Sequence, residues 1–367
     1  MIPPRVLMTA DAVGGVWTYA LDLSRVLSRR GVRVVLAVLG PAPDAAQKRA
    51  AEAVPGLDLV ETGLPLDWLA GSEESLEQAA RVLRGLAAET RPDLIHLNSP
   101  ALKDSLDWGA PVVGACHSCL ATWWEAVRGG PMPEDFVWRT ERLAQGYRRC
   151  DRLIAPSYAF MQQTAGLYGV LPTAVRNGRE RKARGESRPR ERVVLTAGRL
   201  WDEGKNLAVL DRAAGRMGGR VQAAGLLTGP HGQGVAPEHV ASLGLLDAAA
   251  LDERLRRAAV FCSPSLYEPF GLGVLEAAQA GCALVLADIP TFRELWQGAA
   301  VFFDPHDDAA LASLLDAMLA DADWTRRQAA LAARRAATFT VEAMAEGTLR
   351  VYAEALADHA PFGETAA

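Results

Sequence analysis

The segment from Ser263 to Glu276 (SPSLYEPFGLGVLE) places two carboxylates eight positions apart, on either side of a glycine-containing turn. Glu268 precedes the turn, and Glu276 lies in an apolar pattern that predicts a helix. The start of such a helix offers unpaired backbone N–H groups and a positive dipole end, which favour a phosphate or a sugar hydroxyl. Carboxylates beside these groups can accept hydrogen bonds from a polyol. This combination of groups suits a nucleotide sugar.

A second polar segment, from Gly198 to Asn206 (GRLWDEGKN), directly follows a strand predicted over residues 192–197. Arg199 and Lys205 would therefore lie at the carboxyl end of that strand, where parallel sheets bind their ligands. A guanidinium and an ammonium group together can stabilise the charge that develops on a leaving diphosphate. An Arg–Lys pair on a surface is usually only solvated, but the carboxylates downstream favour the interpretation as a diphosphate clamp.

Gly14 and Gly15 stand between the first predicted strand and the first predicted helix. Glycines in this position let the backbone approach a phosphate or a sugar, although a structural tight turn explains them equally well. The full Gly-x-Gly-x-x-Gly pattern is absent, and the second strand ends at Leu39-Gly40 without an acidic residue for a ribose. A dinucleotide-dependent dehydrogenase is therefore disfavoured.

These segments belong to a regular alternation of apolar strands and amphipathic helices, which predicts parallel, doubly wound sheets. We expect strands at 5–8, 32–39, 94–98, 112–116, 151–155, 192–197, 220–227, 260–263, 283–287 and 300–303. We expect helices at 17–30, 75–90, 157–168, 206–217, 252–258, 274–280, after 290, and over 309–337 and 341–357. The polar stretch 176–192 lacks periodicity and is expected to connect two domains.

Composition narrows the class of protein. A chain of 367 residues favours two domains, and a net charge of −5 argues against a general nucleic-acid binder. No apolar run reaches the roughly 18 residues of a membrane-spanning helix, and the N-terminus lacks the pattern of a signal peptide. Five scattered cysteines suggest reduced thiols, so we expect a cytoplasmic location.

Two short motifs raise the question of a metal ion. Cys116-His-Ser-Cys119 would need a second pair of ligands to hold zinc, and the other cysteines do not supply one at close spacing. Asp321-Ala-Asp323 has the form of a motif that binds a metal–diphosphate complex, but it lies late in the chain between helical segments. Solvated loop carboxylates are the better interpretation, since a magnesium site needs ligands that converge near the phosphates. We expect no metal and no other cofactor.

Taken together, these features resemble the retaining glycosyltransferases of family 4, which have the GT-B fold. The resemblance covers nearly the whole chain. It rests on Gly14-Gly15, His117, Asn177-Gly178, Gly198-Arg199 with Lys205, Pro264-Ser265 and Glu268-x7-Glu276. It implies an α/β fold of two Rossmann-like domains that face each other across a cleft. The first, acceptor-binding domain would span 1–172 and the second, donor-binding domain 173–340, with a helix at about 341–360 returning to the first.

The resemblance also implies roles for the matching residues. Arg199 and Lys205 would hold the donor diphosphate, and Glu276 the ribose hydroxyls. Glu268 would hold the donor sugar together with the N–H groups of a turn that consists of Phe270, Gly271, Leu272 and Gly273.

Gly14 and Gly15 would lie near the phosphate and the acceptor, and His117 near the donor sugar or the reacting centre. A lone histidine after a strand is more often structural, so its role comes from the resemblance alone. The implied catalytic residues are Arg199, Lys205, Glu268 and His117.

The implied reaction moves a hexosyl group from a UDP-, GDP- or ADP-sugar to a hydroxyl of a carbohydrate, a lipid or a small molecule. Family 4 enzymes retain the anomeric configuration, by attack on the face that the diphosphate leaves. A nucleotide-sugar 2-epimerase on the same fold and a non-catalytic nucleotide-binding module are the alternatives. The acceptor would be chosen by loops such as 64–72 and 120–133, which carry no readable code. Peripheral membrane contact agrees with the resemblance, although no basic amphipathic helix is evident.

Overall fold

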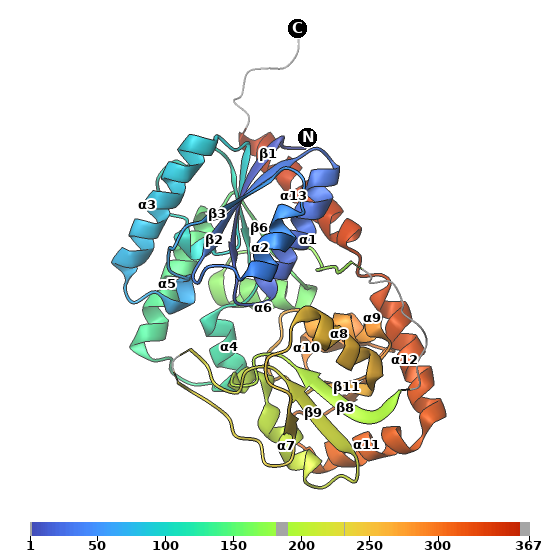
Figure 1. Cartoon of the computed structure of the whole chain (residues 1–367). Coiled ribbons are helices and arrows are strands. Elements are labelled where there is room, and N and C mark those ends of the chain that lie inside the picture. Colours follow the sequence, from blue (N-terminus) through green and yellow to red (C-terminus); the bar gives the residue numbers. More distant parts are fainter. Residues whose placement is uncertain (1, 181–189, 231, 360–367) are drawn as a thin grey trace. The chain divides into compact units, whose positions relative to one another are not determined.

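The computed structural model describes residues 2–180, 190–230 and 232–359 (Figure 1). The chain divides into two compact units. The first unit contains Met1–Glu125, Gly129–Gly178 and Val341–Ala367, and the second contains Ala126–Arg128 and Arg179–Thr340. Each unit has its own parallel sheet with helices packed against it.

The first sheet has seven parallel strands in the order β3-β2-β1-β4-β5-β6-β7. They are β1 (Arg5–Asp11), β2 (Arg33–Leu39), β3 (Leu57–Glu61), β4 (Leu94–Leu97), β5 (Val112–Ala115), β6 (Arg152–Ala155) and β7 (Thr173–Ala174). The direction of chain progression reverses between the neighbours β1 and β4. Ligands of doubly wound sheets bind outside the carboxyl ends of the strands at such a switch point.

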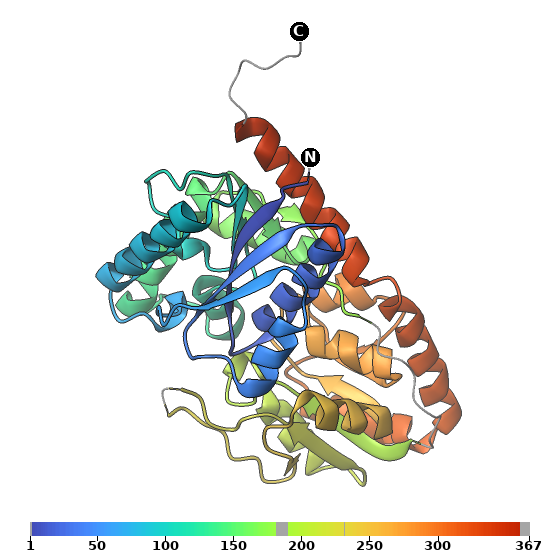
Figure 2. The ribbon, with the colours of Figure 1, turned by 45° about the horizontal axis from the view of Figure 1, so that its top comes forward.

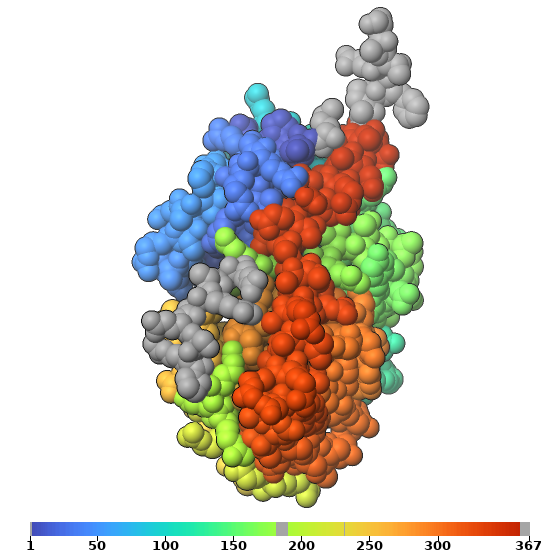
Figure 3. Space-filling model, turned by 90° about the vertical axis from the view of Figure 1, so that its right-hand side faces the viewer, coloured from blue at the N-terminus to red at the C-terminus, as the bar shows by residue number. Residues whose placement is uncertain are grey.

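Helices cover both faces of this sheet (Figure 1). Helices α1 (Gly15–Arg29), α2 (Ala45–Glu52) and α13 (Val341–His359) share one core with alternate side chains of β1 and β2. The opposite face packs against α3 (Glu73–Thr90). Figures 2 and 3 show α13 in red beside the blue α1, so the end of the described chain completes the core of the first unit. The remaining helices of this part are η1 (Asp67–Leu69), η2 (Pro100–Leu102), α4 (Leu120–Val127), α5 (Glu134–Arg149) and α6 (Tyr158–Tyr168).

The second sheet has six parallel strands in the order β10-β9-β8-β11-β12-β13. They are β8 (Glu191–Ala197), β9 (Arg220–Ala224), β10 (Ala241–Ser242), β11 (Ala258–Ser263), β12 (Ala283–Ala287) and β13 (Val301–Phe303). Its helices are η3 (Glu203–Lys205), α7 (Leu207–Ala214), α8 (Ala248–Arg257), α9 (Leu272–Ala280), α10 (Pro290–Trp296), α11 (Asp308–Ala320) and α12 (Ala322–Ala336). The switch point of this sheet lies between β8 and β11.

The structure differs from the sequence-based expectations in several places. The helix expected over 309–337 is two helices, because the Asp321 carboxylate accepts a hydrogen bond from Trp324 N (2.8 Å) and so begins α12. Asp323 pairs with Arg326 in the same helix. The domain boundary expected between residues 172 and 173 precedes the division at Gly178, because β7 pairs with β6 in the first sheet. The helices α2, α4 and α5 and the short strands β3, β7 and β10 were not predicted, and α4 lies in the segment 120–133 that was expected to be a loop.

Gly225 allows the ends of β8 and β9 to approach each other closely. It has φ of +143°, and a Cβ atom at this position would lie 1.9 Å from the carbonyl oxygen of Gly198. The neighbouring contact is a hydrogen bond from Gly198 N to Ala224 O (3.0 Å). Because Gly198 begins the loop that carries Arg199 and Lys205, this glycine helps to position that loop.

We therefore expect Gly225→Ala to lower the free energy of unfolding by about 1–3 kcal/mol, the range for a side chain forced into a strained backbone conformation. Urea unfolding followed by circular dichroism would measure the change. Gly218→Ala is the matched control, because a Cβ atom at Gly218 would meet no atom within 4 Å. Equal stability of the two variants would contradict the prediction.

Candidate functional site

The loop after β8 is a tight turn that is anchored on both sides. Asp202 is buried, and its carboxylate accepts a hydrogen bond from Gly204 N (2.9 Å) at the start of η3. Asn206 follows in the left-handed region, with φ of +52°. Its side-chain amide donates to Pro264 O (3.1 Å) and Pro305 O (2.9 Å). The turn is thereby tied to the loops that follow β11 and β13, and Lys205 between these anchors has a fixed position.

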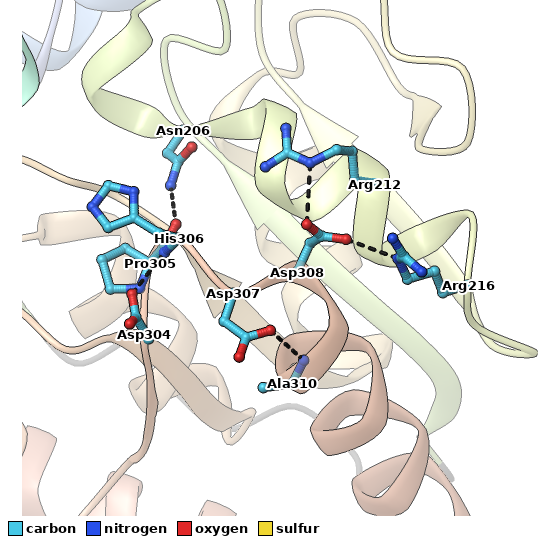
Figure 4. Close-up of polar contacts among 9 residues, drawn as sticks. All are labelled: Asn206, Arg212, Arg216, Asp304, Pro305, His306, Asp307, Asp308 and Ala310. Carbon is cyan, nitrogen blue, oxygen red and sulfur yellow. Dashed lines mark hydrogen bonds and ion pairs between the residues drawn. The ribbon is translucent and has the colours of Figure 1, made fainter.

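The segment after β13 is itself held by charged groups (Figure 4). Asp307 accepts a hydrogen bond from Ala310 N (2.8 Å) at the start of α11. Asp308 pairs with Arg212 Nε (3.2 Å) from α7 and with Arg216 Nε (2.8 Å) from the turn that follows α7. These hydrogen bonds, the one from Arg216 first, lower the pKa of the Asp308 carboxyl. The ion pairs fasten α7 to α11, and so support the Asn206–Pro305 contact beside them.

The central contact of the site joins the two loops at the switch point. Leu266 N donates to Gly204 O (2.9 Å), which places the loop after β11 against the η3 turn. Lys205 Nζ then lies 2.5 Å from Glu268 Oε2, with only 20% and 17% of the two side chains exposed. Glu268 has no other hydrogen-bond partner among the described residues, so its second oxygen is available to a ligand.

The N-terminus of α9 lies beside this ion pair. Gly271 caps the helix with φ of +89°, and no side chain caps the helix N–H groups. A Cβ atom at Gly271 would lie 3.1 Å from Cε1 of Phe292 and 3.3 Å from Cγ of Glu268, so a glycine allows this close approach. Phe270 is buried and packs edge-to-face on Phe339. The uncapped amides of Leu272 and Gly273 therefore start next to Glu268, as an anion site requires.

The structure places Arg199 in the same loop but not in contact with Lys205 or Glu268. Its guanidinium donates to Asp202 Oδ2 (3.3 Å) and lies 5.9 Å from the ring centre of Trp201. The side chain is 48% exposed. A weakly held, half-exposed arginine can turn toward a bound anion at small cost.

Glu276 is brought together with a residue that sequence reasoning missed. Its carboxylate pairs with Arg179 Nη2 at 2.8 Å. Arg179 is fixed through its backbone, which donates to Phe339 O (3.2 Å) and accepts from Gln279 Nε2 (3.2 Å). Arg179 belongs to the expected connecting segment 176–192, of which residues 181–189 lie outside the described part of the structure. Its place directly after Asn177-Gly178 was the available signal.

The remaining predicted site residues belong to the first unit. Gly14 and Gly15 are exposed at the start of α1, which no side chain caps. Gly14 is extended (φ −153°), and its N–H donates to Asp11 Oδ1 (3.2 Å), so backbone strain does not explain this glycine. A Cβ atom there would meet nothing within 4 Å. The open space is compatible with the close approach of a ligand.

His117 follows β5 and is half-buried. Its Nε2 lies 2.7 Å from Asn98 Oδ1, and its ring packs edge-to-face on Tyr19 with the ring centres 4.6 Å apart. Burial, and to a lesser degree the neighbouring His96, lowers the pKa of His117 to about 3. The imidazole is therefore neutral at physiological pH. Sequence reasoning did not single out Asn98, although it is a polar residue directly after a strand.

The loop 64–72 contributes a third residue that sequence reasoning missed. Asp67 lies in η1, close enough to Asp11 for the two charges to interact. Burial raises the pKa of the Asp67 carboxyl to about 6. A hydrogen bond from Trp68 N lowers this pKa in part, and the nearby charge of Asp11 raises it further. The carboxyl edge of the first sheet thus carries a carboxyl group that titrates near neutrality.

The cysteine and aspartate motifs do not form a metal centre in the part of the chain described. Neither Cys116 nor Cys119 forms a disulfide, and burial raises the pKa of both thiols. Across residues 2–180, 190–230 and 232–359 no cluster of three or more His, Cys, Asp and Glu side chains could hold a metal ion. In the same residues, no helix has the length and apolar character needed to cross a membrane.

Comparison with known proteins matches both halves of the chain. The profile of Glycosyltransferase Family 4 matches residues 13–180, and that of Glycosyl transferases group 1 matches residues 235–336. The D-inositol 3-phosphate glycosyltransferase of Nocardia farcinica (strain IFM 10152) is 30% identical, over 95% of this chain and 86% of the relative. The phosphatidyl-myo-inositol mannosyltransferase of Mycobacterium leprae (strain TN) is 27% identical, over 93% of each chain.

Solved structures agree on the fold. Sucrose-phosphate synthase from Thermosynechococcus elongatus has a TM-score of 0.77 at 16% identity, and covers 96% of this chain and 99% of its own. Anabaena Alr3699/HepE, solved in complex with UDP and glucose, has a TM-score of 0.72 at 18% identity, with 95% and 99% covered. The predicted fold class, GT-B with two Rossmann-like domains, is thereby confirmed. The chain is a glycosyltransferase, and it belongs to glycosyltransferase family 4.

Proposed function

We propose that this enzyme transfers a hexosyl group from a nucleotide-diphosphate sugar to an acceptor hydroxyl, with retention of anomeric configuration and without a metal ion. The observation that carries the proposal is the Lys205–Glu268 ion pair beside the uncapped start of α9. A cation, amide donors and a carboxylate meet at the switch point of the second sheet. Diphosphate and sugar hydroxyls are the ligand groups that match these three.

The donor would bind as follows. Lys205 and the amides of Leu272 and Gly273 would hold the diphosphate, and Arg199 would turn toward it from its exposed position. The free oxygen of Glu268 would accept a hydrogen bond from the sugar. Glu276, which is 26% exposed, would exchange part of its contact with Arg179 for the ribose hydroxyls.

The site supports leaving-group stabilisation better than covalent catalysis. Glu268 is engaged with Lys205, so its carboxylate is poorly suited to attack the anomeric carbon as a nucleophile. In the proposed step the bond from the anomeric carbon to the diphosphate breaks, and a bond to the acceptor oxygen forms on the same face. The proton of the acceptor hydroxyl passes to the departing phosphate oxygen. Lys205 and Arg199 stabilise the charge that accumulates on the diphosphate.

We propose that the acceptor group is a polyol hydroxyl on a carbohydrate, a lipid or a small molecule. The relatives are named for transfer to D-inositol 3-phosphate and to phosphatidyl-myo-inositol, so cyclitol phosphates are the first compounds to test. Thermal-shift measurements with UDP, GDP and ADP would first identify the base, and release of the nucleotide with each acceptor would then measure transfer. Epimerised UDP-N-acetylglucosamine formed without an acceptor would indicate an epimerase instead.

Lys205→Ala is expected to lower kcat by about two to three orders of magnitude, the loss found when one key donor to a developing charge is removed. Steady-state kinetics with the identified donor would measure it. Lys48→Ala, which breaks an ion pair with Glu61 in the first unit, is the matched control and should keep full activity. A Lys205→Ala enzyme with normal kcat would exclude the diphosphate role.

Glu276→Ala is expected to weaken binding of the free nucleoside diphosphate by at least about tenfold, the size of one hydrogen bond to a charged group. Isothermal titration calorimetry would give the Kd. Glu342→Ala, which breaks the exposed ion pair with Arg29, serves as the control. If both variants bind the nucleotide as tightly as the native enzyme, Glu276 does not hold the ribose.

Removal of divalent metal should not change the rate. We expect equal turnover with excess EDTA and with added Mg²⁺, because Lys205, Arg199 and the α9 amides would carry the charge of the diphosphate. Loss of activity in EDTA that Mg²⁺ restores would refute metal independence.

A further inference from the structure

Asn98 is the centre of a buried hydrogen-bond network at the switch point of the first sheet. Its side-chain nitrogen donates to Thr9 O (2.5 Å), and its backbone N–H donates to Thr9 Oγ1 (2.8 Å). A carbonyl oxygen can only accept, so the amide nitrogen must face Thr9 and Oδ1 must face the other way. Oδ1 lies 2.7 Å from His117 Nε2 and 3.1 Å from His96 Nε2.

This arrangement determines where the protons of both histidines lie. Oδ1 of Asn98 has no hydrogen to give, so each Nε2 that contacts it must carry one. His96 is fully buried, and burial lowers its pKa to about 4. The neutral His96 ring then has a bare Nδ1, which accepts a hydrogen bond from the hydroxyl of Tyr352 on α13 (2.7 Å). Burial raises the pKa of Tyr352, so this hydroxyl stays protonated.

The same logic applies to His117. The His117 ring contacts Tyr19 from α1 and Asn98, which directly follows β4. The charge of His96 lowers the pKa of His117. No carboxylate among the described residues contributes to the shift, so nothing there favours an imidazolium. With Nε2–H donated to Asn98, the nitrogen left over is Nδ1. Among the described residues Nδ1 has no hydrogen-bond partner, and it is not one of the buried unpaired atoms, so solvent or a ligand can reach it.

We propose that Asn98 is a positioning residue that holds His117 as the neutral Nε2–H tautomer, so that Nδ1 of His117 accepts a hydrogen bond from a substrate hydroxyl. In this state His117 donates no proton to the substrate, and it adds no positive charge beside the leaving diphosphate. That the hydroxyl belongs to a sugar or polyol rests on the proposed function. The tautomer itself does not, because it follows from the contacts of Asn98.

Two-bond ¹H–¹⁵N correlation spectra of the histidine-labelled, full-length enzyme would test the proposal, since they report which ring nitrogen carries the proton. The signals of His117 and His96 would be assigned by their loss in His117→Gln and His96→Gln. We expect both residues as Nε2–H tautomers whose signals do not change as the pH is lowered from about 8 to about 5.5, because both pKa values lie below this range. An Nδ1–H signal for His117, or its titration near the ordinary histidine pKa of about 6.5, would overturn the proposal.

Two variants distinguish a positioning role of Asn98 from a contribution to stability alone. Asn98→Ala should release His117, so that its spectrum shows a tautomer mixture and kcat falls by about tenfold or more, as when other groups that orient a functional imidazole are removed. Tyr352→Phe is the matched control: it removes the hydroxyl from His96 Nδ1 but leaves Asn98 in place, so the tautomer of His117 should persist. An unchanged His117 spectrum in folded Asn98→Ala would refute the role of Asn98. If Asn98→Ala does not fold, the native spectrum still decides, and it does so whether or not the enzyme transfers sugar.

Discussion

The contact between Lys205 and Glu268 is the constraint around which the second unit is arranged. The two residues follow neighbouring parallel strands, β8 and β11, and their loops meet because the backbone of Leu266 bonds that of Gly204. Asn206 adds two bonds to the loops after β11 and β13, and Gly271 lets α9 start against Glu268. Three loops that are far apart in the sequence, those after β8, β11 and β13, thus meet around the Lys205–Glu268 pair.

Such a pair contributes little to stability, because the cost of removing two charges from water offsets most of their attraction. The ion pair instead prepares the site for a ligand. A lysine already held by a carboxylate has lost most of its side-chain freedom, so little further entropy is lost when a diphosphate replaces or shares the partner. The paired state also keeps an ammonium group at the site without an unbalanced buried charge.

The sequence was sufficient for the fold class, and for most of its long elements, because apolar strands and amphipathic helices alternate throughout. It was also sufficient to place Lys205 and Glu268 after strands. It could not show that they touch, since strand order is not visible in a single sequence and the two residues are 63 positions apart. Short or half-exposed elements such as β3 and β7 carry too few apolar residues to be recognised. Asn98 escaped notice because its role depends on side-chain directions across β1, β5 and a helix whose Tyr352 is 256 positions from His96.

The path of the chain has a consequence for any attempt to divide this enzyme. The polypeptide leaves the first unit after Gly178 and re-enters it at Val341, so α13 supplies core residues such as Tyr352 and Ala355 from the far end of the sequence. A gene fragment that stops after residue 178 would encode a sheet with one face partly uncovered, and such a face favours aggregation. Separate expression of the first unit would need α13 joined to it by a short artificial linker, in place of the second unit that nature inserted there.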